Sequence, residues 1–293
     1  MIADYFEPES ISEVVSLLDR FGDDGCVVGG GQSLLVMMRH GLVSPRYLVS
    51  LKKVAGLSGI QESTDGDLTI GAMTTHRDVH RSSLLQRRTP VLCQAAAKVG
   101  STPIRNLGTI AGNICHNELG GDPPGALLVL DSRAVCVSVT GERNVPLAQF
   151  FTGYFETALR PGEVVKAIEI PSPPSDMAGI YLKHVIRSGD LAIVGVAVLL
   201  GLESDGKHYR EVRIGLGGVA PVPLRAHKAE AILRGNEISD GVLKNVAEAV
   251  MSEVDPITDA HGTAEYRRKM VAVFVKRAIR QATEMALQKG KNS

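Results

Sequence analysis

The segment between Val27 and Leu35 constrains this chain most, because three adjacent glycines follow an apolar run there. It reads Val-Val-Gly-Gly-Gly-Gln-Ser-Leu-Leu, which predicts a strand, a tight turn and the first turn of a helix. Because the turn has no Cβ atoms, backbone N–H groups can converge on an anionic group, and the helix N-terminus adds partial positive charge. The pattern favours a phosphate or pyrophosphate site, with a glycine-rich structural turn as the alternative. Leu34 occupies the place of the third glycine of the Rossmann fingerprint, so that fold is not indicated.

A second glycine-punctuated segment runs from Pro103 to Asn113 and reads Pro-Ile-Arg-Asn-Leu-Gly-Thr-Ile-Ala-Gly-Asn. Thr109 and Asn113 add side-chain hydrogen-bonding groups to it. The segment continues to Asp122, which lies between a glycine and a proline and is either a turn former or a ligand contact. Two such loops on separate parts of the chain predict an extended dinucleotide held by both.

Composition narrows the class of protein. A chain of 293 residues favours one large domain or two ordinary ones. Its formal net charge of zero does not favour a nucleic-acid partner. The longest apolar run, Leu191 to Leu202, is shorter than the roughly 20 residues that a membrane span needs, and no signal peptide is indicated. No C-x-x-C pair occurs, so we expect free thiols, a cytoplasmic protein and no metal site, with cysteines at positions 26, 93, 115 and 136.

Periodicity predicts an α-β-α-β lobe over the first fifty residues, with a helix over 8–21 capped by Ser10 and strands over 26–28 and 47–51. A hairpin over 60–70 follows. Thr75 then opens a helix, either as its cap or as a ligand contact. His76 and His80 lie four residues apart on that helix, and we do not expect a metal there because no third ligand is near.

The second half begins after the Pro-Ser-Pro-Pro-Ser segment at 171–175, where we place a domain boundary. Strands over 181–186, 193–200 and 209–216 predict an antiparallel sheet, and helices follow over 224–233, 240–254 and 265–288. The last helix carries a predicted core stripe of Tyr266, Met270, Val273, Phe274 and Ile279. The sequence Gly-Leu-Gly-Gly-Val-Ala at 215–220 matches G-x-G-x-x-A, but prolines at 221 and 223 prevent a helix from opening there.

The two glycine loops together resemble the FAD-binding (medium) subunit of molybdenum hydroxylases of the carbon monoxide dehydrogenase and xanthine dehydrogenase type. Further matches are Ile-Gly-Ala-Met-Thr-Thr-His at 70–76, Tyr-Leu-Lys at 181–183, Ala-Ile-Val-Gly-Val-Ala at 192–197 and His-Gly-Thr-Ala-Glu-Tyr-Arg-Arg at 261–268. They follow in order over nearly the whole chain. The resemblance implies an α+β fold: a two-lobed FAD-binding domain of the PCMH type over 1–173, with lobes of about 1–53 and 54–173. A smaller domain over 178–288 would combine a three-stranded antiparallel sheet with a helical bundle.

The resemblance also implies which residues hold FAD, and no catalytic side chain or metal ligand is among them. From the two loops these are Gly29, Gly30, Gly31, Gln32, Ser33, Leu34, Gly108, Thr109, Ala111, Gly112 and Asn113, with Gly71, Thr74 and Thr75 lining the site. Asp122 would lie near the pyrimidine edge of the isoalloxazine, Val165 would pack on the ring, and Lys183 would approach it from the C-terminal domain.

Two positions depart from the family pattern. Gly189-Asp190 is followed by Leu191, where some members carry an aromatic residue, so stacking on the flavin or its gating can differ there. Ala111-Gly112 stands where Gly-Gly is common, a change that we expect to be harmless.

The function implied by the resemblance is electron relay. A large subunit would hold the molybdenum cofactor, a small subunit would hold iron–sulfur clusters of the 2Fe–2S type, and FAD on this chain would pass electrons to an external acceptor. The complex would be a heterotrimer, with a dimer of heterotrimers as one arrangement. The alternatives are a self-contained FAD-dependent oxidoreductase and a non-catalytic dinucleotide-binding assembly module.

Overall fold

A small parallel sheet forms the N-terminal end of the computed structural model, which describes residues 4–172 and 175–292. Its strands lie in the order β1 (Asp4–Phe6), β3 (Tyr47–Ser50), β2 (Gly25–Val28). Helix α1 (Ile11–Phe21) begins where the Ser10 hydroxyl accepts the Glu13 N–H, as predicted, and a short 3-10 turn η1 (Gly22–Asp24) follows it. Helix α2 (Leu34–Arg39) leads from β2 to β3. The predicted α-β-α-β order is confirmed, and β1 is a strand that the sequence analysis missed.

A five-stranded antiparallel sheet comes next, in the order β4 (Ile60–Glu62), β5 (Leu68–Gly71), β10 (Val164–Ile170), β6 (Arg133–Ser138), β7 (Gly141–Pro146). The predicted β4–β5 hairpin is present, whereas β7 and the small hairpin of β8 (Phe151–Gly153) and β9 (Glu156–Thr157) were not predicted.

Short helices fill the long connection between β5 and β6. They are α3 (His76–Arg81), α4 (Ser83–Arg88), α5 (Pro90–Lys98), α6 (Thr102–Leu107), α7 (Ile110–His116) and α8 (Pro123–Val129), and α9 (Leu147–Phe150) follows β7. Every residue of α8 is buried. The largest core cluster lies between these helices and the five-stranded sheet.

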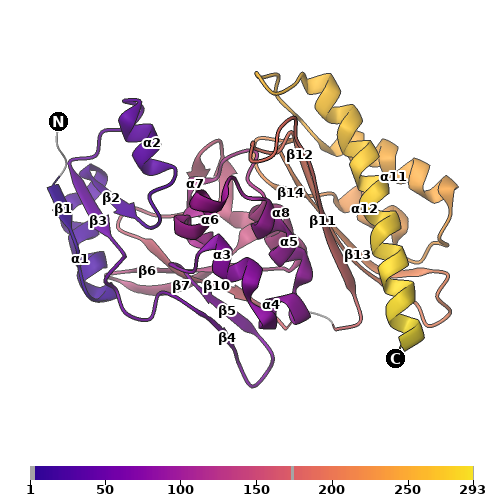
Figure 1. Cartoon of the computed structure of the whole chain (residues 1–293), viewed down its shortest axis with the longest axis horizontal. Coiled ribbons are helices and arrows are strands. Elements are labelled where there is room, and N and C mark those ends of the chain that lie inside the picture. Colours follow the sequence, from indigo (N-terminus) through magenta and orange to yellow (C-terminus); the bar gives the residue numbers. More distant parts are fainter. Residues whose placement is uncertain (1–3, 173–174, 293) are drawn as a thin grey trace.

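A four-stranded antiparallel sheet, β11 (Ala178–His184), β12 (Val194–Leu202), β13 (Tyr209–Gly217) and β14 (Leu224–Arg225), closes the other side of the helices. The predictions of three strands and of a helix over 224–233 are therefore wrong at one point, because Leu224–Arg225 pairs with β13 as a fourth strand and the helix begins at His227. Figure 1 shows the three main sheets following one another along the long axis, with α5 and α8 between the second and the third. Alternate residues of β12 contribute to two different cores, Ala197 and Leu199 to one, Val196 and Val198 to the other. Burial on both faces explains why this strand is a continuous apolar run.

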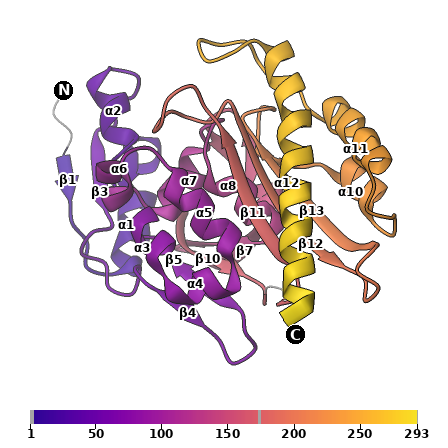
Figure 2. The same cartoon turned by 45° about the vertical axis from the view of Figure 1, so that its right-hand side comes forward.

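Three helices cover the outer face of that sheet: α10 (His227–Leu233), α11 (Asp240–Glu253) and α12 (Ala264–Asn292), as Figure 2 shows. Residues 173 and 174 of the predicted linker lie outside the described residues. The predicted core stripe of α12 is partly wrong, because Tyr266 is 42% exposed and Val273 is only partly buried. The buried face is carried instead by Val271, Val275, Ala278, Ile279 and Ala282.

Close packing explains the glycines of the 215–220 segment. A Cβ added at Gly215 would overlap the carbonyl oxygen of Gly125 on α8, and Gly218 has a φ of +79°. Gly215 lets α8 approach β13, and Gly218 permits the left-handed backbone beside Ile193, so the G-x-G-x-x-A match marks close packing instead of a dinucleotide site.

Arg267, 2% exposed, fixes the start of α12 to the four-stranded sheet. Its guanidinium donates to the carbonyl oxygens of Ile193 and Gly218, both at 2.8 Å, and makes a two-pronged ion pair with Asp259 at 2.7 and 2.8 Å. A buried cation is stable only when it is paired in this way. The His-Gly-Thr-Ala-Glu-Tyr-Arg-Arg match at 261–268 therefore has a structural role at this position.

We expect Arg267→Met to lower the free energy of unfolding by about 3–5 kcal/mol, because it leaves two buried carbonyls and one carboxylate without their partner. The matched control is Arg280→Met on the same helix, which removes an ion pair to Asp240 with side chains 57% and 86% exposed and costs at most about 0.5 kcal/mol. Urea unfolding measures both variants. Equal losses in the two would contradict the role assigned to Arg267.

Candidate functional site

The two glycine loops lie in direct backbone contact. A Cβ added at Gly30 would overlap the carbonyl oxygen of Leu107 and lie 2.8 Å from the Cα of Gly108. A Cβ added at Gly29 would lie 3.1 Å from the Thr109 hydroxyl oxygen. The loops are therefore not at opposite ends of a wide groove, because one rests on the other.

A third segment joins the two loops through main-chain hydrogen bonds. The N–H of His76 donates to the Gly108 carbonyl, and the N–H of Ile110 donates to the Thr74 carbonyl, each at 3.0 Å. Thr75 and Thr109 form an isolated antiparallel bridge. The structure thus brings together the predicted residues of segments 29–34, 74–75 and 108–113.

The first loop presents unused donors. Within the described residues, the N–H groups of Gln32, Ser33 and Leu34 make no hydrogen bond, whereas Leu35 N–H already bonds to Gly31. The side chain of Gln32 holds the turn by donating to the Gly30 carbonyl at 3.1 Å, and Gly31 adopts a φ of +69°. Three consecutive N–H groups without a partner in the protein can donate to a phosphate or pyrophosphate.

The threonine hydroxyls are used by the protein itself. Thr75 accepts the Asp78 N–H and caps α3, and Thr109 accepts the Gly112 N–H and caps α7. Thr74 donates to the Gly59 carbonyl and accepts the Gly59 N–H, both at 3.0 Å. The capping interpretation of Thr75 is therefore what the structure shows.

Asn113 carries a buried acceptor without a partner. Its side-chain oxygen has no hydrogen bond within the described residues, and a Cβ added at Gly121 would lie 3.5 Å from it. An unsatisfied buried acceptor beside a Cβ-free position fits a ligand that offers a hydroxyl or ring N–H there. FAD has both groups, so the residues present fit this cofactor.

Asp122 and Lys183 form a buried ion pair between α8 and β11. Their side chains are 4% and 5% exposed, and the ammonium lies 2.8 Å from Asp122 Oδ2. Lys183 also donates to the carbonyl of Lys98 at the end of α5, and the Tyr181 hydroxyl donates to Asp122 Oδ1 at 2.7 Å. Burial raises the pKa of Asp122, and the attraction of Lys183 opposes that rise.

The other predicted residues have packing positions. Val165 is 2% exposed and belongs to the largest core cluster beside a β-bulge. Gly71 lies against the Leu57 carbonyl, where a Cβ would overlap, and Ala111 is 4% exposed with its methyl in the core, which explains how alanine replaces glycine there. Leu191 is 44% exposed and packs against Gly120.

Three residues of this region were not predicted. Leu107 supports Gly30 through its carbonyl. Tyr181 could have been inferred, because residues two apart on a strand share a face and Lys183 was already singled out. His76 was considered only as a metal ligand; it is 3% exposed, and burial together with Arg105 lowers its pKa to about 4.

Other classes of site are absent from the part of the chain that the structure describes. No group of three or more His, Cys, Asp or Glu side chains there could hold a metal ion. Among the described helices, none combines the length and apolar character required to cross a bilayer. All four cysteines are free, with Cys93 and Cys136 buried and the other two partly buried.

We expect Gly30→Ala to release FAD and to destabilise the N-terminal half, because its Cβ meets backbone atoms that cannot move aside. Gly29→Ala is the control, since its Cβ meets only the Thr109 side chain at 3.1 Å and should be tolerated. Flavin absorbance after desalting and the urea midpoint report on both variants. If Gly30→Ala kept its flavin and its midpoint, the backbone contact would not be needed.

Comparison with known proteins gives the family. The FAD binding domain in molybdopterin dehydrogenase matches residues 1–173, and the CO dehydrogenase flavoprotein C-terminal domain matches residues 180–282. Subunit alpha of the 6-hydroxypseudooxynicotine dehydrogenase complex of Paenarthrobacter nicotinovorans is 32% identical, over 97% of this chain and 95% of its own.

Solved structures agree with this assignment. A chain of carbon monoxide dehydrogenase from Hydrogenophaga pseudoflava, in a form lacking the Mo-pyranopterin moiety of the molybdenum cofactor, superposes with a TM-score of 0.93 at 34% identity, covering 98% of this chain and 99% of that one. Quinoline 2-oxidoreductase from Pseudomonas putida 86 gives 0.91 at 30% identity, covering 98% of both chains. The chain belongs to the FAD-binding medium subunits of the molybdenum hydroxylases, a family of oxidoreductases, and its fold is the two-part α+β fold of that family.

Proposed function

We propose that this chain is the electron-transfer subunit of a molybdenum-containing hydroxylase or dehydrogenase. It would take electrons from iron–sulfur clusters of a small subunit and pass them to an external acceptor, while a large subunit holds the molybdenum cofactor. The observation that carries the proposal is that two loops in direct backbone contact hold unpartnered polar groups, the main-chain donors at 32–34 on one and the Asn113 oxygen on the segment that follows the other.

The residues of this chain would bind and orient the flavin, and the flavin supplies the redox chemistry. We propose that the 29–34 loop surrounds the pyrophosphate with N–H groups and that Asn113 accepts from a hydroxyl or ring N–H. Gly108, Thr109, Ala111 and Gly112 would shape the second wall, and Gly71, Thr74 and Thr75 would support it. Asp122, Val165 and Lys183 would lie at the isoalloxazine, where Asp122 and Lys183 set the local charge.

The relatives favour a multi-subunit arrangement. Their names describe a complex subunit and, for the carbon monoxide dehydrogenases, a medium chain. We propose a heterotrimer in the cytoplasm, with FAD-binding and C-terminal domains over 1–173 and 178–288. The self-contained oxidoreductase would need its own substrate pocket at the flavin, and the assembly module would need no flavin at all.

Copurification tests the proposal. The tagged chain, expressed with the genes next to its own, should bring down a large and a small subunit, and the complex should contain molybdenum, iron and FAD. Substrate added without an acceptor should bleach the flavin absorbance. A yellow, folded chain that oxidises a substrate alone as fast as in any complex would establish the self-contained enzyme instead.

A pair of variants tests the placement of Asp122 and Lys183. Asp122→Asn leaves Lys183 uncompensated, so the midpoint potential of the flavin should rise by on the order of 30 mV, about 1.4 kcal/mol for two electrons. Lys183→Met should change the potential much less, because the buried Asp122 carboxyl then takes up a proton and the pair stays neutral. Potentiometric titration of the flavin measures both. No change in Asp122→Asn would place the pair away from the ring.

A further inference from the structure

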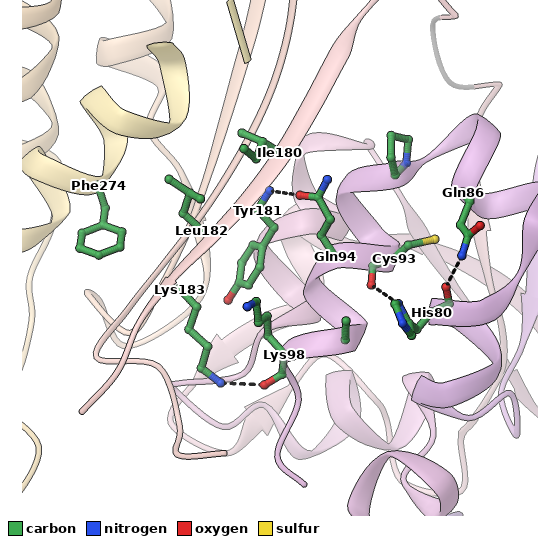
Figure 3. A pocket seen from close by; sticks show the side chains of 12 residues that line it. His80, Gln86, Cys93, Gln94, Lys98, Ile180, Tyr181, Leu182, Lys183 and Phe274 are labelled. Carbon is green, nitrogen blue, oxygen red and sulfur yellow. Dashed lines mark hydrogen bonds between the residues drawn. The ribbon is translucent and has the colours of Figure 1, made fainter. Parts of the chain in front are cut away.

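A cleft of about 650 Å³ runs along the free edge of β11, outside the loops described above. Figure 3 shows Cys93, Gln94 and Lys98 of α5 on one side and Leu182 with Phe274 of α12 on the other. His80 and Gln86 close its far end. This volume is in the range of small-molecule sites.

The floor of the cleft is an unpaired strand edge. β11 has β12 as its one neighbour in the sheet, and the Tyr181 N–H donates at 2.8 Å to Gln94 Oε1, so residue 181 faces away from β12. Because facing alternates along an antiparallel strand, the Tyr181 carbonyl and the Lys183 N–H also point outward. Neither has a hydrogen bond within the described residues, which leaves an acceptor and a donor side by side.

The side chains around this edge are apolar, neutral polar or cationic. No Asp or Glu is among the lining residues of the cleft, and its charged side chains are Lys98 and Lys183. Lys183 is already compensated by Asp122 and by the Lys98 carbonyl. The Lys98 ammonium makes no ion pair or hydrogen bond within the described residues, but it lies close enough to Asp122 for its charge to lower the pKa of that carboxyl. Lys98 and Lys183 therefore share one carboxylate, which leaves one positive charge in excess at the cleft. A negatively charged ligand is favoured.

The occupant is a compact molecule instead of an added peptide strand. Helix α5 lies too close to β11 for another strand, since a Cβ added at Gly179 would lie 3.1 Å from Val91 and the Gln94 side chain reaches the strand edge. An added strand needs a spacing of about 4.8 Å along several residues. A flat ring needs only the short stretch between Tyr181 and Lys183, with Leu182 and Phe274 against one face.

We propose that this cleft binds a planar, negatively charged N-heterocycle whose ring carries a hydrogen-bond donor next to an acceptor. The ring N–H would donate to the Tyr181 carbonyl, the adjacent ring carbonyl would accept the Lys183 N–H, and the anionic substituent would face Lys98. The site lies outside the two glycine loops and shares Lys183 with the proposed flavin site: the ring would use the main-chain N–H of Lys183, whereas the flavin would meet its side chain.

Three probes separate the parts of this recognition. Orotate has the donor–acceptor edge and a carboxylate, uracil has the edge alone, and benzoate has a ring and a carboxylate without the edge. Isothermal titration calorimetry with the full chain carrying its FAD should show saturable binding of orotate, at least tenfold tighter than that of either other probe. Equal affinities for orotate and benzoate, or no binding of orotate at millimolar concentration, would overturn the proposal.

Two variants place the binding in the cleft. Lys98→Gln should weaken orotate about tenfold and leave uracil unchanged, whereas Lys244→Gln on α11, away from the cleft, should change neither. Ala97→Phe should fill the cleft and abolish binding of both, with flavin content and the thermal midpoint confirming the fold. Should that variant not fold, the two lysine variants decide the question by themselves. Unchanged orotate affinity in Lys98→Gln would overturn the proposal.

Discussion

The backbone contact between Gly30 and the Leu107–Gly108 segment is the constraint on which the rest of the N-terminal half depends. It joins a parallel sheet to helices of a different lobe without any side chain in between. Because main-chain atoms have fixed positions, this contact sets where the free donors of one loop lie relative to Asn113 of the other. A cofactor that contacts both loops would find their relative positions already fixed, which lowers the entropy cost of binding.

Main-chain contacts also fix the ends of the short helices. Thr75 and Thr109 use their hydroxyls to cap α3 and α7, and their backbones bridge to each other. These threonines therefore fix the helix ends and position backbone groups of the loops, which is the role that N-caps have in ordinary proteins. In the proposed FAD site, side-chain recognition would be left to a few polar atoms such as the Asn113 oxygen and the Asp122–Lys183 pair.

Local features of the fold could be predicted from the sequence, and long-range packing could not. The Ser10 cap, the 60–70 hairpin and the glycine turn follow from residue type and spacing within a few positions. The buried face of α12 was predicted less well. Arg267 lies on that face although it is charged, and Tyr266, which was expected there, lies on the exposed side. Nor could periodicity show that Asp122 and Lys183 meet, since sixty residues and a predicted linker separate them. Residue-level assignment of the FAD site depended on the resemblance. Backbone donors in the first loop were predicted from its glycines, but only the structure shows that the N–H groups of residues 32–34 have no partner in the protein.

The largest core cluster contains residues from both sides of the 171–175 segment. Met177, Tyr181, Ala197 and Leu199 pack in one cluster with α5, α8 and strands of the five-stranded sheet. A protease cut in the 171–175 segment would therefore sever the covalent connection without freeing either fragment, because each covers an apolar face of the other. The two fragments would stay associated as the subunits of a heterodimer do, and either fragment made alone would expose the apolar face that the other covers.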